Sequence, residues 1–471
     1  MKTVLALDFG ASSGRAIKAV YDGEAISYEE IHRFENIPIE KDGHIFHNVD
    51  MIMEEIYKAI EKAPDADSLA FDTWGVDYGL LDENSRLISM PYHYRDIRTD
   101  GILKRAYEHM PPQQLYEETG NQIMPINTLF QLMTDENLKK AKTLLFMPDL
   151  FGFMLTGKCA CDYTIASTSQ MLNPKTLRWS DKVLESFSAD GDVFAPLTKP
   201  STVLGKYKGI EVVTVAGHDT QCAVAAMPCK SENAAFLSCG TWSLIGCEVD
   251  EPILSSKSNE LELSNEIGAN GKINYLKNIS GLWLIQELRR DLAKKGEKYS
   301  YNDLEMLARA SEPFKCFIDP DAQELSRHGN LSEKIKAYCK KTNQYVPQTV
   351  GEQVRCIYES LALKYKYALK QISQCTEKQF QVLHMLGGGT KDGFLCEMTA
   401  DCLGIPVVAG PVEATALGNI ILQLIALGEI KSVGQGREII AKSEKLSTYL
   451  PHISDGLNSA YGRYVNIIEK K

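Results

Sequence analysis

The sequence lacks the patterns that usually mark membrane, secreted and zinc-binding proteins. None of its twelve cysteines are spaced C-x-x-C, so we expect buried, reduced thiols and neither disulfides nor a zinc site. The most apolar stretch, residues 414–427, is too short to cross a bilayer and contains Asn419 and Gln423. The apolar start of the chain ends at Asp8, too early for a signal peptide. These absences predict a cytoplasmic protein.

Positive charge is also scarce. The chain has 51 Lys and Arg against 62 Asp and Glu, a net charge of −11, which argues against a nucleic acid or an anionic membrane as partner. A length of 471 residues suggests two or three domains. Low-complexity and Pro/Ser-rich linkers are missing, so we place the domain boundary in the turn at residues 228–233. The predicted domains are residues 1–230 and 231–471.

Two polar hairpins, one in each half of the chain, have the same shape. Residues 3–7 and 16–21 form strands around a glycine-flanked turn at residues 8–15, and residues 234–246 repeat this with a break at residues 239–241. Glycines give such turns backbone freedom, and their N–H and hydroxyl groups can hold a phosphate. The first turn is not a P-loop, because it lacks G-x-x-x-x-G-K-[ST] and no helix follows. The repetition predicts duplicated α/β domains facing each other across a cleft; a plain polar hairpin is the alternative.

A carboxylate stands about one helix before the second hairpin. His218-Asp219-Thr220 follows the apolar run 212–215 and precedes a small-residue helix that begins near Gln221. An acid that can accept a proton, close in sequence to a loop that can hold a phosphate, predicts a kinase with Asp219 as the base. The alternative is that His-Asp is a helix N-cap.

Two further stretches have the composition of ligand sites. Residues 72–78 place two acids, a tryptophan and a glycine at a strand end, which is typical of a sugar-facing rim because carboxylates accept from hydroxyls and an aromatic face covers C–H groups. A strand–turn with a packed Trp74 is the alternative. Residues 387–389 are three glycines between a strand and a helix, where the backbone can approach a ligand and the helix N-terminus favours phosphate.

Several motifs, in one order along nearly the whole chain, resemble the FGGY family of sugar kinases in the actin/Hsp70/hexokinase superfamily. Besides residues 8–15, they are DTWGVDY (72–78), YRDIRT (94–99), HDT (218–220), CGTWSL (239–244), KNISGLWL (277–284) and GPVEATALG (410–418). The resemblance implies an α/β fold of two RNase H-like (actin-like ATPase) domains with the active site in the cleft between them. It also implies transfer of the ATP γ-phosphoryl group to a sugar hydroxyl.

The resemblance assigns roles by position. Asp219 would accept the proton of the sugar hydroxyl, and Asp8 would hold Mg²⁺ through water. Hydroxyl partners decide sugar choice, which adds Asp77 and Arg95 as candidates. The expected ATP contacts are Ala11, Ser12, Ser13, Gly14, Arg15, Gly240, Thr241, Gln286, Gly387, Gly388 and Gly389. The expected sugar contacts are Gly75, Asp77, Arg95, His218, Asp219, Thr220 and Asn278.

The expected substrates are a ketose and ATP, with Mg²⁺ as the metal. Related ketoses such as fuculose and xylulose are alternative substrates. A non-catalytic sugar or nucleotide sensor on the same fold is a further alternative, which retention of Asp8, Thr241 and Asp219 together disfavours. The sequence does not indicate an oligomeric state.

Overall fold

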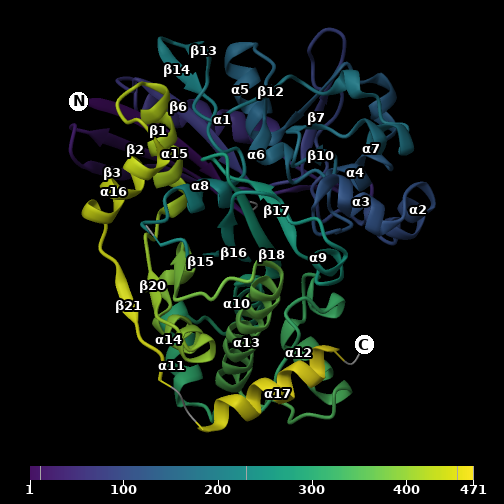
Figure 1. Cartoon of the computed structure of the whole chain (residues 1–471), viewed down its shortest axis with the longest axis vertical. Helices are drawn as coiled ribbons and strands as arrows, with labels where there is room; N and C mark the ends of the chain where they lie inside the picture. Colours follow the sequence, from purple (N-terminus) through teal and green to yellow (C-terminus); the bar gives the residue numbers. More distant parts are fainter. Residues whose placement is uncertain (11, 230, 453–454, 470–471) are drawn as a thin grey trace. The chain divides into compact units, whose positions relative to one another are not determined.

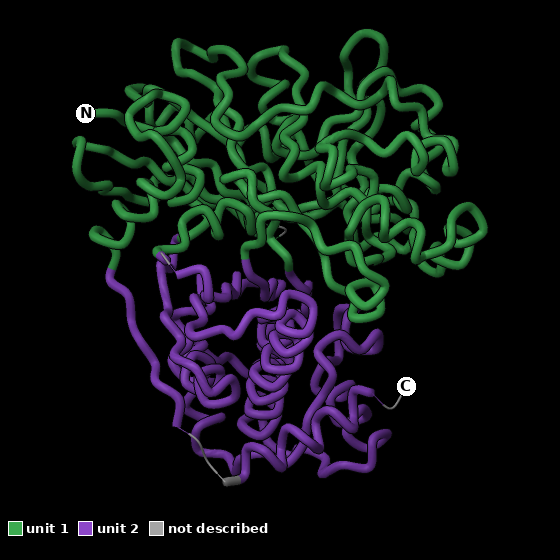
Figure 2. Tube along the Cα trace, viewed as in Figure 1, with its two compact units in different colours: residues 1–228, 248–275, 414–444 green, residues 229–247, 276–413, 445–471 purple. Residues whose placement is uncertain are grey.

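The computed structural model describes residues 1–10, 12–229, 231–452 and 455–469, and its contacts divide the chain into two compact units (Figures 1 and 2). Unit 1 contains residues 1–228, 248–275 and 414–444, and unit 2 contains residues 229–247, 276–413 and 445–471. Each unit is therefore assembled from segments that lie far apart in the sequence. Lys230 is outside the described residues, and the domain boundary between residues 230 and 231 stays a prediction.

Unit 1 is built on a mixed sheet with the strand order β13-β14-β6-β1-β2-β3. Strands β1, β2 and β3 pair antiparallel, whereas β6 runs parallel to β1 and β14 runs parallel to β6. Every residue of β6 is buried, as expected for a parallel strand covered on both faces. The bounds are β1 (Lys2–Phe9), β2 (Ser13–Tyr21), β3 (Ile26–Glu35), β6 (Ser68–Thr73), β13 (Val203–Tyr207) and β14 (Ile210–Val213).

Helices from both ends of the chain cover this sheet. Helix α15 (Ala414–Ala426) packs on β1, β6 and α8 (Asp219–Ala225), and α5 (Met147–Thr156) packs on β6 and β13. The spacing of Met53, Ile56 and Ile60 predicts an amphipathic helix at residues 50–62. The structure has α1 (Val49–Glu61), which Asn48 caps and whose buried face includes Ile56 and Ile60. The apolar periodicity therefore located α1 within one residue at each end.

The contact between α15 and α8 depends on one glycine. A Cβ atom at Gly418 would lie 1.8 Å from the carbonyl oxygen of Cys222, so the two helices touch through their backbones. We expect Gly418→Ala to lower the free energy of unfolding by about 3 kcal/mol or more, because the helices must separate. Gly462→Ala, in α17 (Asp455–Glu469), is the matched control since nothing lies within 4 Å of its Cβ position. Urea unfolding should show it unchanged or stabilised by up to about 1 kcal/mol, and equal effects at both sites would contradict the expectation.

Unit 2 repeats the arrangement of unit 1. Its strands belong to a seven-stranded sheet with the order β17-β18-β16-β15-β19-β20-β21, of which β17 (Ser264–Ile267) is counted with unit 1. Strand β15 pairs antiparallel with β16, β19 runs parallel to β15, and β20 runs parallel to β19. A hairpin followed by parallel strands thus occurs once in each unit, as the two similar hairpins predict. The bounds are β15 (Ala234–Cys239), β16 (Trp242–Val249), β18 (Ile273–Ser280), β19 (Val382–Leu386), β20 (Val407–Ala409) and β21 (Ser447–Tyr449).

The long helix α13 (Val350–Thr376) is the central helix of unit 2 and packs against α11 (Tyr301–Ala310) and α14 (Gly393–Leu403). The pattern Thr349-x-x-Glu352 predicts a capping box, and it is present: Thr349 accepts from the N–H of Glu352, and Glu352 accepts from the N–H of Thr349. The sequence also predicts a closing helix at residues 411–427, but α15 does not close the chain, because α16 (Val433–Ser443), β21 and α17 follow it. Two glycines, Gly434 and Gly436, weaken the helical pattern of α16. Across the part of the chain that the structure describes, no helix is both long and apolar enough to cross a membrane.

Candidate functional site

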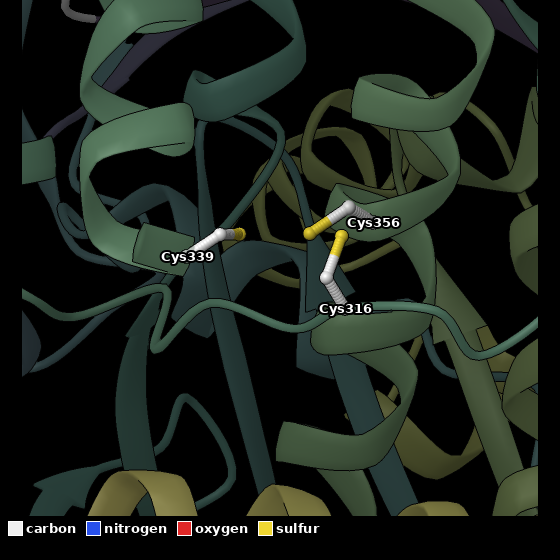
Figure 3. Close-up of side chains that lie close together, drawn as sticks. All are labelled: Cys316, Cys339 and Cys356. Carbon is white, nitrogen blue, oxygen red and sulfur yellow. The ribbon is translucent and has the colours of Figure 1, made fainter. Parts of the chain in front are cut away.

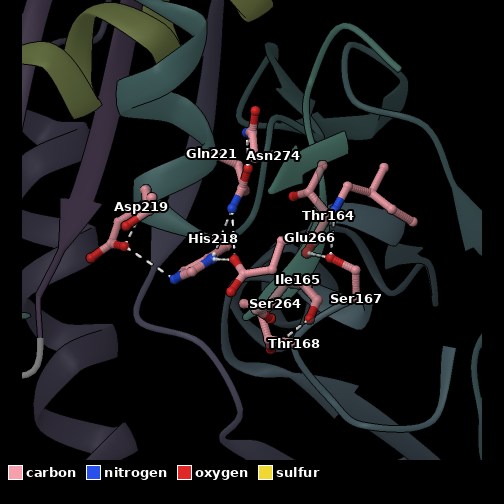
Figure 4. A network of polar contacts seen from close by, with 12 residues as sticks. Thr164, Ile165, Ser167, Thr168, His218, Asp219, Gln221, Ser264, Glu266 and Asn274 are labelled. Carbon is pink, nitrogen blue, oxygen red and sulfur yellow. Dashed lines mark hydrogen bonds and ion pairs between the residues drawn. The ribbon is translucent and has the colours of Figure 1, made fainter. Parts of the chain in front are cut away.

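A chain of polar contacts in unit 1 ends at the predicted base (Figure 4). Asp219 is the first residue of α8, and its side chain is 34% exposed. His218 Nε2 lies 3.4 Å from Asp219 Oδ1, and His218 Nδ1 lies 3.0 Å from Glu266 Oε2 on β17 (Ser264–Ile267). Gln221 donates to the same Glu266 oxygen over 2.7 Å. Glu266 therefore orients His218, which in turn points at an accessible Asp219 carboxylate.

The charges of this chain keep the histidine cationic over a wider pH range. Burial lowers the pKa of His218, but the hydrogen bond and the negative charge of Glu266, with Asp219, outweigh it and raise this pKa above its ordinary value. Burial raises the pKa of Asp219, and Asp8 adds to this, while His218 and the N–H of Thr220 act in the opposite direction. The N–H of Thr220 donates to Asp219 Oδ1 over 2.5 Å. The raised pKa makes Asp219 more basic than a free aspartate, and the hydrogen bond from Thr220 fixes the orientation of its carboxylate.

Two more carboxylates belong to neighbouring strand ends in unit 1. Asp8 on β1 is paired in register with Asp72 on β6. Arg15 donates to Asp8 Oδ2 from Nε over 2.9 Å and from Nη2 over 2.7 Å. Asp72 is fully buried, and its Oδ1 has no hydrogen-bond partner. Burial, followed by the charge of Asp8, raises the pKa of Asp72 well above its ordinary value. Two carboxyl groups therefore lie next to each other at the C-terminal ends of β1 and β6, and one of them is paired with an arginine.

Helix α15 supplies the support for Asp72. Asn419 donates to Asp72 Oδ2 over 2.7 Å, Gln423 donates to Asn419 Oδ1 over 2.7 Å, and Ser68 donates to Gln423 over 2.7 Å. All four side chains are completely buried. This chain of hydrogen bonds connects α15 to the start and the end of β6, and it fixes the position of Asp72 Oδ2.

Asp77, predicted to contact the sugar, is the centre of a buried network. Its Oδ2 accepts from His47 Nε2 over 2.6 Å, from Trp74 Nε1 over 2.9 Å and from the N–H of Tyr94 over 3.1 Å, and its Oδ1 accepts from Gln131 over 2.9 Å. Burial raises the pKa of Asp77, but these donors and the charge of His47 lower it below its ordinary value. With 0% exposure, the carboxylate holds neighbouring residues in place in this structure.

The turn between β6 and β7 (Tyr78–Leu81) is held in an unusual backbone conformation. Val76 has φ +66°, a left-handed value that is a genuine outlier for a β-branched residue. The N–H of Val76 donates to Thr168 Oγ1 over 3.2 Å, and Thr128 Oγ1 donates to the carbonyl of Val76 over 2.7 Å. The side chain of Thr168 also lies against the position that a Cβ atom at Gly75 would occupy. Surrounding hydrogen bonds therefore impose a strained backbone on the predicted sugar-binding motif, as is common at functional sites.

The sequence pattern predicts an ordinary polar surface from residue 165 to residue 206, but the start of this stretch is buried, as is the Asp162–Thr164 motif before it. Asp162, Thr164, Ser167 and Gln170 are each 3% exposed or less. Asp162 caps α6 (Tyr163–Ala166), and its Oδ1 also accepts from the N–H of Gly217 over 2.9 Å. The prediction was wrong because the polar groups of this segment are satisfied inside the protein, by one another and by the chain just before His218.

Asp162 gives this loop a pH-dependent stability. Burial raises its pKa to about 6, because hydrogen bonds from Thr164 and Gly217 only partly offset desolvation. The carboxyl group thus binds its proton more tightly in the folded protein than in the unfolded one. The ionised carboxylate therefore destabilises the fold above pH 6, and this destabilisation disappears as the pH falls towards 3.8. We expect Asp162→Asn to be more stable than wild type at pH 7.5, by up to about 3 kcal/mol, and the gain to shrink to about 1 kcal/mol at pH 4.5.

Urea unfolding across this pH range measures the difference. Asp190→Asn removes one negative charge from an exposed cap and serves as the control. A gain for Asp162→Asn that grows as the pH falls would contradict the assigned direction.

The predicted nucleotide residues of unit 2 converge around Cys239. The carbonyls of Gly240 and Thr241 accept from the N–H groups of residues 281–283, which brings Gln286 Oε1 to 3.4 Å from Thr241 Oγ1. A Cβ at Gly389 would lie 2.3 Å from Cys239 Sγ, so only glycine allows this turn to lie against the β15–β16 turn. Two turns far apart in the sequence therefore form one glycine-rich surface.

The remaining predicted residues are placed less tightly. Ser12 and Ser13 lie at the β1–β2 turn, Arg95 stacks on Tyr94, and Asn278 is half-buried on β18. Ala11 lies outside the described residues. The predicted reason for Gly14 was wrong: its φ is not positive, and the residue is glycine because a Cβ would lie 2.2 Å from the Phe34 ring.

The predicted residues divide between the units. Asp8, Ser12 to Arg15, Gly75, Asp77, Arg95 and His218 to Thr220 belong to unit 1, whereas Gly240, Thr241, Asn278, Gln286 and Gly387 to Gly389 belong to unit 2. A cleft shared by both sets stays a prediction. The sequence pattern gave no role to Glu266, Asn419 or Asp162; of these, only Asn419 has a local signal, as a polar residue inside the apolar stretch 414–427.

Comparison with solved structures gives the fold. A gluconate kinase from Lactobacillus acidophilus superposes with a TM-score of 0.78 at 16% identity, covering 99% of this chain and 96% of that chain. Together with the repeated hairpin-and-parallel-strand arrangement, this likeness gives the two-domain actin-like ATPase fold.

Sequence comparison gives the family. The N-terminal domain model of the FGGY family of carbohydrate kinases matches residues 3–236, and the C-terminal domain model matches residues 235–427. A rhamnulokinase of Bacteroides thetaiotaomicron is 38% identical, covering 98% of this chain and 99% of that protein. A rhamnulokinase of Oceanobacillus iheyensis is also 38% identical, covering 96% of this chain and 99% of that protein. The chain belongs to the FGGY family of carbohydrate kinases. It is an ATP-dependent sugar kinase, and ATP-dependent phosphoryl transfer uses a divalent cation.

Proposed function

We propose that the protein phosphorylates L-rhamnulose at its 1-hydroxyl, giving L-rhamnulose 1-phosphate and ADP, as a step of L-rhamnose catabolism. The support is the likeness to rhamnulokinases over almost the whole length of both chains. The observation that carries the chemistry is the accessible Asp219 carboxylate at the end of the Glu266–His218 chain. The cytoplasm is the proposed location, because twelve free thiols suit a reducing compartment.

Asp219 is proposed as the base. Phosphoryl transfer passes through a loose transition state, so the alcohol proton is lost late and a carboxylate suffices to accept it while orienting the hydroxyl. The raised pKa of Asp219 makes it a stronger base than a free aspartate. The hydroxyl would donate to the Asp219 carboxylate, and His218, Thr220, Gly75, Asp77, Arg95 and Asn278 would contact or position the sugar.

The nucleotide is proposed to bind the glycine-rich surface of unit 2 and the β1–β2 turn. Gly240, Thr241, Gln286 and residues 387–389 would contact ATP from unit 2, with Ser12 to Arg15 and Ala11 doing so from unit 1. N–H and hydroxyl groups at such turns bind phosphate oxygens in positions that suit the transition state.

The proposed metal is Mg²⁺, held by Asp8 through water. The residues fit a hard cation: Asp72 and Asp219 each feel the negative charge of Asp8, and Asp72 Oδ1 is buried without a partner. When bound, Mg²⁺ neutralises charge on the β- and γ-phosphates.

The test is ADP release with Mg²⁺-ATP over a panel of L-rhamnulose, L-fuculose, D-xylulose and glycerol. We expect the highest kcat/KM with L-rhamnulose, and ³¹P NMR of the product should show phosphate coupled to the C1 protons. Faster turnover of another ketose would keep the kinase and overturn the substrate. Hydrolysis of ATP that no sugar stimulates would overturn the proposed function.

A further inference from the structure

Three cysteines of unit 2 meet at one point in the core (Figure 3). Cys316 lies in the connection that follows α11, Cys339 in α12 (Leu331–Lys341) and Cys356 in α13. Their sulfur atoms all lie within 4.8 Å of one another, and the three residues are 3%, 0% and 2% exposed. The side chains point towards a common centre from three separate elements.

We propose that Cys316, Cys339 and Cys356 form a three-thiolate site for a thiophilic d¹⁰ metal ion, Zn²⁺ or Cu⁺, that fastens the Cys316 segment to α12 and α13. Thiolate sulfur binds such ions at about 2.3 Å, so three sulfurs around one ion lie about 4 Å apart. The observed separations need only a small contraction to reach this. Among the described residues, the cluster contains no fourth histidine, cysteine or carboxylate ligand. That favours three-coordinate Cu⁺, or Zn²⁺ completed by water.

The segment that carries Cys316 is held on both sides. The N–H of Phe314 donates to Glu359 over 2.8 Å, the N–H of Phe317 donates to Gln344 over 2.8 Å, and the N–H of Ile318 donates to Ser360 over 2.9 Å. Two of these acceptors are on α13, three and four residues beyond Cys356, which is about one helical turn. The backbone thus presents the sulfur atoms together before any ion binds, which limits the ordering that binding requires.

The binding step is an exchange of protons for metal and involves no oxidation. Each thiol that ligates the ion loses its proton to solvent, and one metal–sulfur bond forms for each proton released. Because the ligands come from three elements that separate on unfolding, the free energy of binding adds to the stability of the fold. The nearest alternative is that the thiols are small apolar side chains that pack the core.

The experiment compares metal binding by wild type and matched variants. Reduced protein, stripped by a chelator, is titrated with Zn²⁺ and, anaerobically, with Cu⁺, in competition with a chromophoric chelator; metal per chain is measured after gel filtration. Cys339→Ala and Cys356→Ala remove ligands. Cys402→Ala, at a fully buried cysteine of α14 outside the cluster, is the control.

We expect one ion per chain in wild type and in Cys402→Ala, bound at least about 100-fold more weakly by the two cluster variants, with a Tm increase that depends on the same thiols. The ion that wins in competition identifies the metal. X-ray absorption of the loaded wild type should show three sulfur neighbours, a result that does not depend on any variant folding. Binding equal in all four proteins, or a metal without sulfur neighbours, would overturn the site and leave the kinase proposal untouched.

Discussion

Asp219→Asn is expected to lower kcat about 10³-fold while the KM for the sugar changes only a few-fold. The substitution removes the proton acceptor but keeps an oxygen that can accept from the N–H of Thr220. General bases contribute about 10²- to 10⁴-fold to rates, and the sugar-binding groups stay in place. Steady-state ADP release, measured with saturating Mg²⁺-ATP, gives both constants.

The control for this variant is Asp181→Asn. Asp181 is also the first residue of a short helix, α7 (Asp181–Ser186), but it is exposed, so its loss should leave kcat unchanged. If Asp219→Asn retained more than about a tenth of the wild-type kcat, another group would have to be the base. Unchanged melting curves for both variants would show that the fold is intact.

The raised pKa of Asp219 adds a pH signature. A base works only when it is deprotonated, so kcat is expected to fall as the pH drops through this pKa, which burial raises above the ordinary aspartate value. The acid limb should therefore lie at a higher pH than a free aspartate would give, and Asp219→Asn should abolish it. An identical limb in the variant would assign it to another group.

The largest effect on stability is expected from Asp77→Ala. The substitution removes the acceptor of His47, Trp74 and the N–H of Tyr94 in a site where Asp77 is 0% exposed. Gln131 loses one acceptor and keeps the carbonyl of Ile126. Removing one partner from a buried ionic network costs about 3–5 kcal/mol. Urea unfolding measures the loss, and a drop of that size is expected to lower Tm by about 10 °C.

The sign of its pH dependence follows from the same contacts. The pKa of Asp77 is lowered in the fold, so its contribution is present above the ordinary aspartate pKa and is lost as the pH falls through the lowered value. The difference between wild type and Asp77→Ala should therefore shrink under acid conditions. Asp192→Ala, at an exposed position, is the control. If Asp77→Ala lowered the free energy of unfolding no more than Asp192→Ala does, the network would not contribute to stability.

Local signals allowed much of the fold to be predicted from the sequence. Alternating and continuous apolar runs located β1, β2, β15 and β16, and the capping box located the start of α13. The His218–Thr220 motif was readable because a strand, a polar triplet and a helix adjoin one another in the chain. Each of these depends on residues within about ten positions.

The rest of the site could not be predicted because its contacts are distant in sequence. Glu266 is 48 residues from His218, and Asn419 is 347 residues from Asp72. Nothing in the spacing of Cys316, Cys339 and Cys356 indicates that they meet. The burial of Asp77 was also hidden, because a strand-end carboxylate has the same local pattern whether it meets a ligand or a neighbouring side chain.

The three-segment composition of unit 1 has a consequence for how the protein is made. Its first 228 residues leave the ribosome long before α15 does, yet β1 and β6 rely on that helix to cover them and to supply Asn419 and Gln423. Throughout most of translation the nascent sheet therefore has an uncovered apolar face and an unsupported Asp72. This unit can reach its final state only when the chain is almost complete, so its folding is essentially post-translational.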